Sequence, residues 1–571
     1  MQTSVSENKK SNLLILLALL GITVLGAGLR LYEIGSKTVW LDEAFSIWLA
    51  RHSLPEMIRL IIDVDQHPPL YYILFHYWIQ LGGWNASWVR GFSALVGTLA
   101  IPAIFLLGRR LGGALVGLFS ALVLAINPFQ VSYGQEVRTY AFLTLTVTIA
   151  LWAMACLLTD PRSRSMGLGQ QLEEYYRSWR KARKAENRQQ EDAGVGYSRD
   201  FRDNLEWVQA PTTRQYLPFQ SVTTDLAWLI YIIFTAATVY CHNTAFFFPI
   251  GTNLFVFALM LYRKIFQREN SEERPIDEMQ LQPPSFKNWF LAQVAVFLLW
   301  SPWLAAFIAQ LLGVEKDFWI PKPDLNAVIS VLKDFLSAYL PQNISWDSVI
   351  WLMFIGIILL GFVYFRKRLA YAFFLFFIFL TPVAGELIAS LKQPIFYNRT
   401  LIWAPIPLYV LIAAGIRQLR FKPYILAAVT ILAVINFLSI RDFYRYYEKE
   451  RWDEAAAYVA QNVRDSDLII FNAGWTQIPF DYYFTNYNLK VDEEGAPATL
   501  FQRGVLEPKM TEKDLPRLRS LIRGRDRVWL VYSHNWYTDP QSLIPSALLE
   551  ELDMLDTREF NGMQVFLYGV K

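Results

Sequence analysis

Residues 12–43 read NLLILLALLGITVLGAGLRLYEIGSKTVWLDE, and this stretch decides the fold class. Residues 12–31 carry a single charged side chain, Arg30, close to their end. About twenty mainly apolar residues is the length that an α-helix needs to cross the hydrocarbon core of a bilayer. The run lacks a small-residue cleavage site, so we interpret it as a retained membrane helix and not as a signal peptide. Asp42 and Glu43 then lie beyond its end, at a membrane surface.

The composition of the whole chain agrees with a membrane protein. Hydrophobic residues make up 54% of the 571 residues and charged residues 18%, whereas a soluble globular protein contains about 25% charged residues. The formal net charge of +3 is too small to indicate nucleic-acid binding, and two cysteines exclude a disulfide scaffold. The chain is therefore predicted to be a polytopic α-helical membrane protein.

Apolar blocks of about membrane-spanning length recur along the chain and predict about eleven transmembrane helices, with interfacial helices between them. The blocks lie at residues 12–31, 87–107, 112–128, 139–158, 225–241, 245–262, 288–309, 347–365, 369–390, 400–416 and 422–440. A further apolar piece, Pro69–Leu81, is short and contains His76 and Gln80. We interpret this piece as interfacial or re-entrant, since it is not long enough to span.

The positions of the basic residues support this count, because Lys and Arg collect in the cytoplasmic loops of membrane proteins. With the N-terminus inside, each predicted cytoplasmic connection is basic: Arg109-Arg110, residues 159–221, Arg263-Lys264, Arg366-Lys367-Arg368 and Arg417-Arg420-Lys422. Counting Pro69–Leu81 as a span would place the later basic loops outside. The sequence thus predicts a multi-pass protein of the cell (inner) membrane whose chain after residue 440 lies outside the cytoplasm.

Two domains are predicted. Residues 1–440 form the transmembrane domain, with 159–221 as a polar cytoplasmic insert, and residues 441–571 form a small extracytoplasmic soluble domain. In the second domain the residue pattern predicts helices at Trp452–Ala460 and near 541–555, and strands at Asp467–Phe471, Arg527–Tyr532 and Phe560–Tyr568. This mixture of elements indicates an α/β fold.

The predicted outer loops hold an unusual set of polar and aromatic residues. They contain Asp42 and Glu43, the sequence HPPLYY at 67–72, the sequence YGQEVRTY at 133–140, and PIFYNR at 394–399. The predicted spans contain almost no ionisable residue, and Glu386 is near an outer end. A coupled transporter would place such residues near the midplane. Chemistry at the outer boundary instead suits a substrate that is part lipid and part polar.

These motifs, together with Arg90 at the start of the second span, resemble those of the GT-C superfamily of membrane glycosyltransferases. The resemblance is to the protein O-mannosyltransferases and the lipid A aminoarabinose transferase, and it covers roughly residues 12–440. It implies a GT-C-like transmembrane domain. It also implies an inverting enzyme of the cell envelope that moves a hexosyl or pentosyl group from a polyprenyl phosphate to an acceptor hydroxyl on the outer face.

The resemblance implies catalytic roles for three carboxylates. Asp42 matches the family carboxylate that is taken to act as base on the acceptor hydroxyl, and a base must reach the proton that it abstracts. Glu43 either orients Asp42 or is a surface charge. Glu136 matches the second acidic position of the family.

The leaving group would be a lipid phosphate, which needs cationic or hydrogen-bonding partners. His67 stands where relatives with a Lys-Pro-Pro-Leu motif have lysine, so this contact would depend on pH. Arg138 and Arg399 are the alternatives, since a guanidinium is always charged and matches phosphate geometry; as outer-loop residues they also fit lipid-headgroup contacts. Tyr140 and Tyr397 fit this site or an interfacial anchor equally well.

The sequence predicts no cofactor. Asp42, Glu43, Glu136 and His242 could supply oxygen and nitrogen ligands to a divalent cation, but no tight metal spacing is present, so no metal site is predicted. The expected partners are the polyprenyl-phosphate-sugar donor, a glycan, lipid or protein acceptor, and the lipid bilayer. The main alternative function is a transporter or polymerase of lipid-linked oligosaccharides or polysaccharides, and another is an inactive relative with a scaffolding role. Midplane charges or internal repeats would favour transport. The sugar, the acceptor and the length of the carrier do not follow from the sequence.

Overall fold

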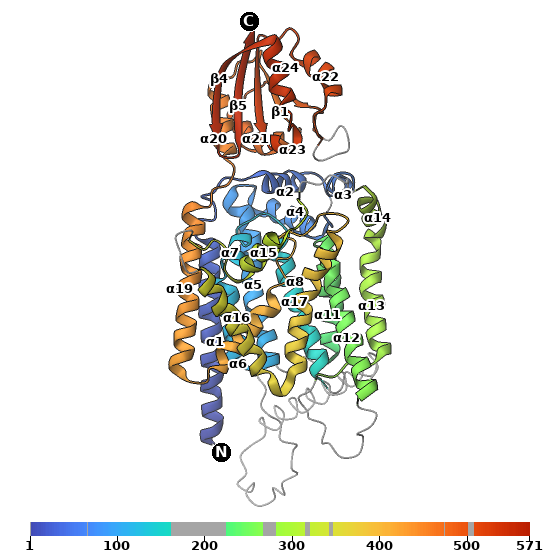
Figure 1. The fold of residues 1–571 in the computed structure, drawn as a ribbon, viewed down its shortest axis with the longest axis vertical. Coiled ribbons are helices and arrows are strands. Elements are labelled where there is room, and N and C mark those ends of the chain that lie inside the picture. The colour runs from blue at the N-terminus through green and yellow to red at the C-terminus, as the bar shows by residue number, and fades with distance from the viewer. Residues whose placement is uncertain are drawn as a thin grey trace, which may run out of the picture.

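The protein consists of a helical bundle with a small sheet domain stacked on one of its ends, and its two termini lie at opposite ends of the longest axis (Figure 1). The computed structural model describes residues 2–65, 67–160, 224–266, 281–313, 320–341, 347–472, 474–500 and 508–570. The predicted insert 159–221 lies, from residue 161 onward, outside the described residues.

The bundle contains the predicted membrane helices. Within the described residues, eight segments are long and apolar enough to cross a membrane. They comprise α1 (Gln2–Leu31), α5 (Ala86–Gly112), α8 (Tyr140–Thr159), η2 with α12 (Asn243–Phe246, Phe247–Phe266), α13 with η3 and α14 (Phe286–Trp300, Ser301–Trp303, Leu304–Gly313), α16 (Asp347–Tyr364), η4 with α17 (Arg366–Arg368, Leu369–Ala389) and α19 (Lys422–Tyr446). Each of these segments coincides with a predicted span.

Three further apolar helices occupy the remaining predicted spans. They are α6 (Ala114–Ile126), α11 (Thr224–Val239) and α18 (Ile406–Gln418). The residues of α18 from Ile406 to Ile416 are all buried, against α16 and α6 among others, so this helix is covered by protein and not by lipid. The prediction that it begins at residue 400 was wrong, because turns precede Ile406 and Pro405 and Pro407 mark the helix start.

Two other predicted helices differ in detail. The span predicted at 288–309 is interrupted by a 3₁₀ turn at Ser301–Trp303, and Pro302 accounts for the break because it has no backbone N–H to donate. Helix α19 continues to Tyr446, beyond its predicted end at residue 440. The helix therefore carries the chain out of the bundle and towards the sheet domain (Figure 1).

Short helices cover the end of the bundle that faces the sheet domain. They are α2 (Leu41–Arg51), α3 (Leu54–Asp63), α4 (Leu70–Gly82), α7 (Pro128–Tyr133) and α15 (Leu325–Ser337). Figure 1 shows α4 at the level of α2 and not across the bundle. With 13 residues, α4 is about 20 Å long. This position agrees with the prediction that Pro69–Leu81 does not span, which stays a prediction.

The C-terminal domain is a three-layer α/β unit. Its sheet has the order β2-β1-β3-β5-β4, in which β1 pairs in parallel with β2 and β3, and β5 pairs antiparallel with β3 and β4. The strands are β1 (Leu468–Asn472), β2 (Asp492–Ala496), β3 (Arg527–Ser533), β4 (Leu552–Phe560) and β5 (Met563–Val570). The helices are α20 (Trp452–Asn462), α21 (Gln477–Phe484), α22 (Leu515–Ile522), α23 (Asn535–Thr538) and α24 (Leu543–Glu551), with 3₁₀ turns η5 (Gly474–Thr476), η6 (Thr485–Tyr487) and η7 (Glu512–Asp514).

Side chains alternate between the two faces of this sheet, as expected for strands buried on both sides. Leu468 and Ile470 pack with α22 and α24, whereas Ile469 and Phe471 pack with α20 and α21. The helix predicted near 541–555 was wrong in its last part. It ends at Glu551, and the following residues form β4, because they pair with β5 as a hairpin.

The sheet domain is tied to the first loop of the bundle, the loop that leads to Asp42. The hydroxyl of Tyr483 accepts a hydrogen bond from the backbone N–H of Val39 at 2.7 Å, and Thr38 donates to the carbonyl of Glu450 at 2.7 Å. Tyr482 donates to the carbonyl of Trp84 at 2.8 Å. The first loop is therefore held from both the bundle and the sheet domain.

Helices α16 and α18 approach each other closely at glycines. A Cβ atom on Gly361 would overlap the carbonyl oxygen of Leu411, and one on Gly415 would overlap that of Ile357. Small residues allow such approach between membrane helices. On α16, which also carries Gly361, a Cβ on Gly356 would have no atom within 4 Å.

We expect Gly361→Val to lower the melting temperature in detergent strongly, because overpacking of a core costs about 1–3 kcal/mol or more. Gly356→Val is the matched control, since it makes the same change of helix propensity on α16 without the overlap. Equal melting temperatures for the two variants would contradict this packing.

Candidate active site

Asp42 lies in the first turn of α2, not in an open loop as the sequence suggested. A helix N-terminus favours a negative charge. The carboxylate accepts a hydrogen bond from Arg399 Nη1 at 2.7 Å, and Arg138 Nε lies 4.0 Å from the same oxygen. The side chain remains 21% exposed. The structure thus places a partly accessible carboxylate between two guanidinium groups.

The charges around Asp42 decide its ionisation. Burial alone would raise its pKa, but the positive charges of Arg138, Arg399 and His67 outweigh this effect and hold the pKa below its usual value. His534 of the sheet domain acts in the same direction, so the C-terminal domain contributes to the field at this carboxylate. Asp42 is therefore ionised at neutral pH.

Glu43, the next residue, has a different environment. Its side chain is 0% exposed, so the alternative that it is a surface charge was wrong. Arg90 donates to both carboxylate oxygens, at 2.8 and 2.7 Å, and Lys449 donates at 3.0 Å. The backbone N–H of Val137 adds a fourth bond at 3.1 Å. Donors from α5, from the 136–139 loop and from the segment after α19 therefore occupy the carboxylate of Glu43. This residue connects three parts of the chain beside Asp42.

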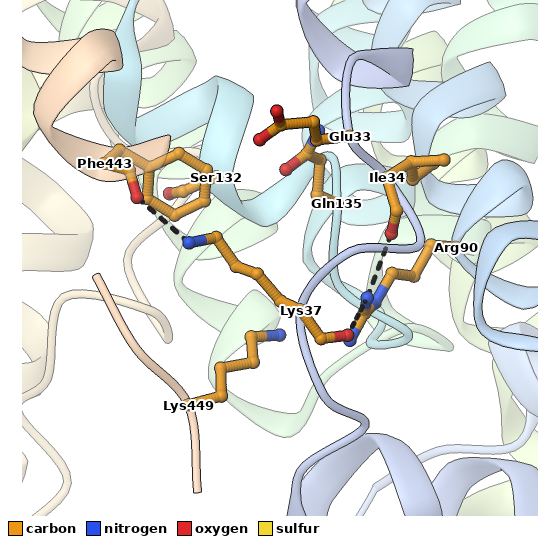
Figure 2. A pocket seen from close by; sticks show the side chains of 8 residues that line it. All are labelled: Glu33, Ile34, Lys37, Arg90, Ser132, Gln135, Phe443 and Lys449. Carbon is orange, nitrogen blue, oxygen red and sulfur yellow. Dashed lines mark hydrogen bonds between the residues drawn. The ribbon is translucent and has the colours of Figure 1, made fainter. Parts of the chain in front are cut away.

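Arg90 extends this network into the first loop. Its guanidinium also donates to the carbonyls of Ile34, Lys37 and Thr38, at 2.7–2.9 Å. Figure 2 shows Arg90, Lys37 and Lys449 around a small cavity. Its volume of about 10 Å³ corresponds to roughly one water molecule. The loop that leads to Asp42 is therefore fixed by a dense polar network.

Glu136 lies near the two carboxylates of α2. Its side chain is buried, and Lys449 Nζ is 3.6 Å from Oε1. Burial raises the pKa of Glu136, and the negative charges of Glu43 and Asp42 act in the same direction, whereas Lys449 and Arg399 oppose them. Glu136 is thus a carboxyl group that takes up a proton more readily than a free glutamate.

Arg138 is the most buried of the three predicted basic phosphate ligands. Its guanidinium is buried, and Nη1 donates to the Tyr72 hydroxyl at 3.4 Å. Its Nε is buried and lacks a hydrogen-bond partner within the described structure. A buried donor without a partner is costly. An anion bound beside Asp42 would satisfy it.

His67 lies next to Arg138, whose Nη2 is 3.5 Å from His67 Nε2. The other ring nitrogen, Nδ1, is 2.7 Å from Asp65 Oδ1. The ring of His242 meets that of His67 edge to face at 5.0 Å. The structure therefore brings His67 into the site together with two residues to which the sequence assigned no phosphate role, Asp65 and His242.

Arg399 and its neighbours close the other side. The Arg399 guanidinium lies over the Tyr397 ring at 5.3 Å, and Tyr397 is 36% exposed. Asn398 donates to Asp334 of α15 at 2.8 Å, which holds this turn in place. Tyr140 is buried, with its ring 5.1 Å from that of Tyr133 and 6.5 Å from that of His242.

The structure thus gathers the predicted residues around Asp42, with Arg138 and Arg399 beside it, His67 beyond Arg138, and Tyr397 at an exposed edge. Lys449 was missed by the sequence reasoning, and no local pattern marks it. Asp65 carried a signal in the spacing Asp-x-His. In the described part of the chain, no three His, Cys, Asp or Glu side chains come together as metal ligands would.

Comparison with known proteins gives one family match. The family model described as dolichyl-phosphate-mannose-protein mannosyltransferase matches residues 66–169, a range that includes His67, Glu136 and Arg138. No curated protein sequence matches the chain.

Solved structures match a larger part of the chain than the family model does. ArnT from Cupriavidus metallidurans in the apo state superposes with a TM-score of 0.57 at 10% identity, over 98% of this chain and 98% of that one. ArnT bound to undecaprenyl phosphate gives a TM-score of 0.53 at 11% identity, over 96% and 97%. The archaeal oligosaccharyltransferase AglB from Archaeoglobus fulgidus, in complex with an inhibitory peptide and a dolichol-phosphate, gives 0.53 at 12% identity, over 97% of this chain and 74% of that one.

These comparisons show a shared fold that includes the sheet domain, since nearly the whole chain is covered. The chain is a multi-pass membrane protein with the GT-C fold, and it resembles the O-mannosyltransferases and ArnT.

The buried position of Glu43 predicts a large effect on stability. Glu43→Gln leaves Arg90 buried without its countercharge and Lys449 with Glu136 at 3.6 Å, so it should destabilise the protein by about 3–5 kcal/mol. The exposed pair of Arg519 and Glu550, at 2.6 Å, supplies the control, because Glu550→Gln should change the melting temperature little.

The pH dependence follows from the same site. The folded protein lowers the pKa of Glu43 from 4.5 to about 2, since Arg90 and Lys449 outweigh the effect of burial. This stabilisation is complete above pH 4.5 and is lost as the pH falls towards about 2. Equal melting temperatures of wild type and Glu43→Gln at neutral pH would contradict the stabilisation by Glu43.

Proposed function

We propose that the protein is an inverting glycosyltransferase. It moves a sugar from a polyprenyl-phosphate carrier to an acceptor hydroxyl at the outer face of the membrane. The observation that carries the proposal is the position of Asp42 between Arg399 and Arg138, at the end of a membrane bundle with the GT-C fold. The related structures of ArnT with undecaprenyl phosphate and of AglB with a dolichol-phosphate support a carrier of this class.

In the proposed reaction, Asp42 is the base. The acceptor oxygen attacks the anomeric carbon, its proton passes to Asp42, and the bond from that carbon to the phosphate oxygen breaks. A single displacement inverts the anomeric configuration. A positioned carboxylate must lie within hydrogen-bond distance of the hydroxyl, and the partial exposure of Asp42 leaves room for an acceptor to approach.

The leaving phosphate is held by Arg138, Arg399 and His67. The buried Nε of Arg138, which has no hydrogen-bond partner among the described residues, would donate to the phosphate. A phosphate bound here competes with Asp42 for the two guanidinium groups. Since these groups hold the pKa of Asp42 low, donor binding would raise the basicity of Asp42 when the reaction needs it. Tyr140 and Tyr397 flank this subsite.

The two glutamates have other roles in the proposal. Glu43 is a positioning residue, because Arg90, Lys449 and Val137 occupy its carboxylate and it cannot also serve the acceptor. Glu136 is buried near Asp42 with its pKa raised, and its readiness to carry a proton suits contact with sugar hydroxyls.

The site is proposed to face outward from the cell (inner) membrane. The support is the alternation of basic loops with eleven apolar helices, since positive loops remain in the cytoplasm. The sheet domain adjoins the same end of the bundle as Asp42, at α2 (Figure 1). Outside the cytoplasm, it would be placed to meet a glycan, lipid or protein acceptor.

The role of Asp42 predicts a specific kinetic effect. Asp42→Asn keeps the size of the side chain but removes the proton acceptor, so transfer should fall by at least about 10²-fold. Donor binding should be kept or strengthened, because the amide competes less with phosphate for Arg138 and Arg399, and the loss of thermal stability should be smaller than in Glu43→Gln. Arg138→Ala should instead weaken donor binding as well as turnover, because it removes a partner of the phosphate.

Both variants are assayed in one preparation by transfer rate, by undecaprenyl-phosphate binding and by melting temperature. Asn253→Ala, which removes contacts to Gln293 and Trp289 within the bundle, controls for loss of a buried hydrogen bond. Near-normal turnover of a folded Asp42→Asn protein would contradict the assignment of the base.

The orientation has a separate test. A reporter that is active only in the cytoplasm should be silent when it is fused after Lys571, because the proposed topology places the sheet domain outside. The same reporter inserted after Arg110, in a proposed cytoplasmic loop, should be active. The reverse pattern would overturn the orientation and leave the chemistry of the site unaffected.

A further inference from the structure

A carboxylate–imidazole pair lies beside the proposed phosphate subsite. His67 Nδ1 is 2.7 Å from Asp65 Oδ1, and Asp65 is 5% exposed. This contact fixes the tautomer of the His67 ring. Because a carboxylate can only accept a hydrogen bond, Nδ1 carries a proton and donates it to Asp65. Nε2 is then the nitrogen that points away from Asp65, towards Arg138.

The pair is anchored from a distant helix. Gln310 of α14 is buried and donates to the carbonyls of Ile61 and Asp65, at 3.0 and 2.8 Å. These contacts bind the chain just after α3 to a membrane-spanning segment. Asp65 therefore presents a fixed acceptor to His67, even though both residues lie in a connection between two short helices.

The charged and titratable groups around His67 are Asp42, Asp65, Tyr72, Arg138 and His242. Burial alone would raise the pKa of Asp65, but the His67 imidazole and then Arg138 and the Tyr72 hydroxyl hold it below its usual value. Arg138 Nη2, which can only donate, lies 3.5 Å from His67 Nε2, so this nitrogen is the acceptor in the structure. An anion between Arg138 and His67 would accept from Arg138 and free Nε2.

His242 does not supply a competing positive charge. Its Nδ1 accepts the backbone N–H of Thr244 at 3.1 Å, so this nitrogen carries no proton and the ring is neutral. Burial, followed by the charges of His67, Arg138 and Arg399, lowers the pKa of His242 well below its usual value. Of the His67 and His242 rings, His67 is the one that has a carboxylate partner in the described structure, Asp65.

We propose that His67, held by Asp65, donates the proton that neutralises the leaving lipid phosphate. This inference rests on the proposed function and goes beyond it, because it makes His67 an acid and Asp65 a positioning residue. When a phosphate oxygen replaces Arg138 Nη2 at Nε2, this nitrogen takes up a proton from water. As the bond between the anomeric carbon and the phosphate oxygen breaks, that proton passes to a phosphate oxygen. His67 is then neutral again, and Asp42 returns the acceptor proton to water.

Substitution by lysine separates charge from proton donation. Lysine is a permanent cation at this pH and a weaker acid than imidazolium, so His67→Lys should bind the phosphate but protonate it poorly.

We expect three results with the full-length protein in detergent. The affinity of His67→Lys for undecaprenyl phosphate should stay within about threefold of wild type, because lysine keeps a donor and a positive charge at this position. The turnover of His67→Lys should be about 10²-fold lower than that of wild type near pH 6. Asp65→Asn should lose turnover to a similar extent while its binding near pH 6 stays within about threefold of wild type.

His52→Gln is the matched control, since His52 bonds to the Trp48 carbonyl at 2.9 Å away from this cluster and should leave both measurements unchanged. Wild-type turnover in His67→Lys would show that His67 serves as a cation only, and wild-type turnover in Asp65→Asn would remove its positioning role. Either result overturns the inference. A wild-type protein that releases no lipid phosphate from any donor would overturn the proposed function itself, so the two failures are distinguishable.

Discussion

The carboxylate of Glu43 is the contact on which the rest of the site depends. A buried carboxylate is stable only if its charge and lone pairs are compensated. Here Arg90, Lys449 and the Val137 N–H do so from three parts of the chain, and Arg90 also binds three carbonyls of the first loop. This network joins the first loop, the loop before α8 and the segment that enters the sheet domain.

Adjacent residues on α2 consequently have opposite tasks. Glu43 is sealed and has its oxygens occupied, whereas Asp42 remains partly open and is held by guanidinium groups that a phosphate could recruit. The sheet domain takes part through Lys449, through the contacts of Tyr483 and Glu450 with the first loop, and through the charge of His534. The geometry around Asp42 is therefore a property of the whole chain and not of the bundle alone.

Much of the fold was predictable from sequence, because span length and hydropathy are local properties, and the eleven apolar blocks coincide with helices. Errors arose where tertiary contacts decide, as at β4, which pairs with β5, or where prolines interrupt a block, as before α18. The motifs marked Asp42, Arg138 and Arg399. Lys449 escaped because it lies 406 residues from its partner Glu43, and only the folded chain brings the two together.

The most direct measurement of the central claim is the release of free lipid phosphate. Purified protein is incubated with a panel of polyprenyl-phosphate sugars and hydroxyl acceptors, and the freed polyprenyl phosphate is quantified together with the anomeric configuration of the product. The account predicts stoichiometric release with inversion for at least one donor. Release with retention, or transfer of the sugar together with its phosphate, would contradict a single displacement with Asp42 as the base.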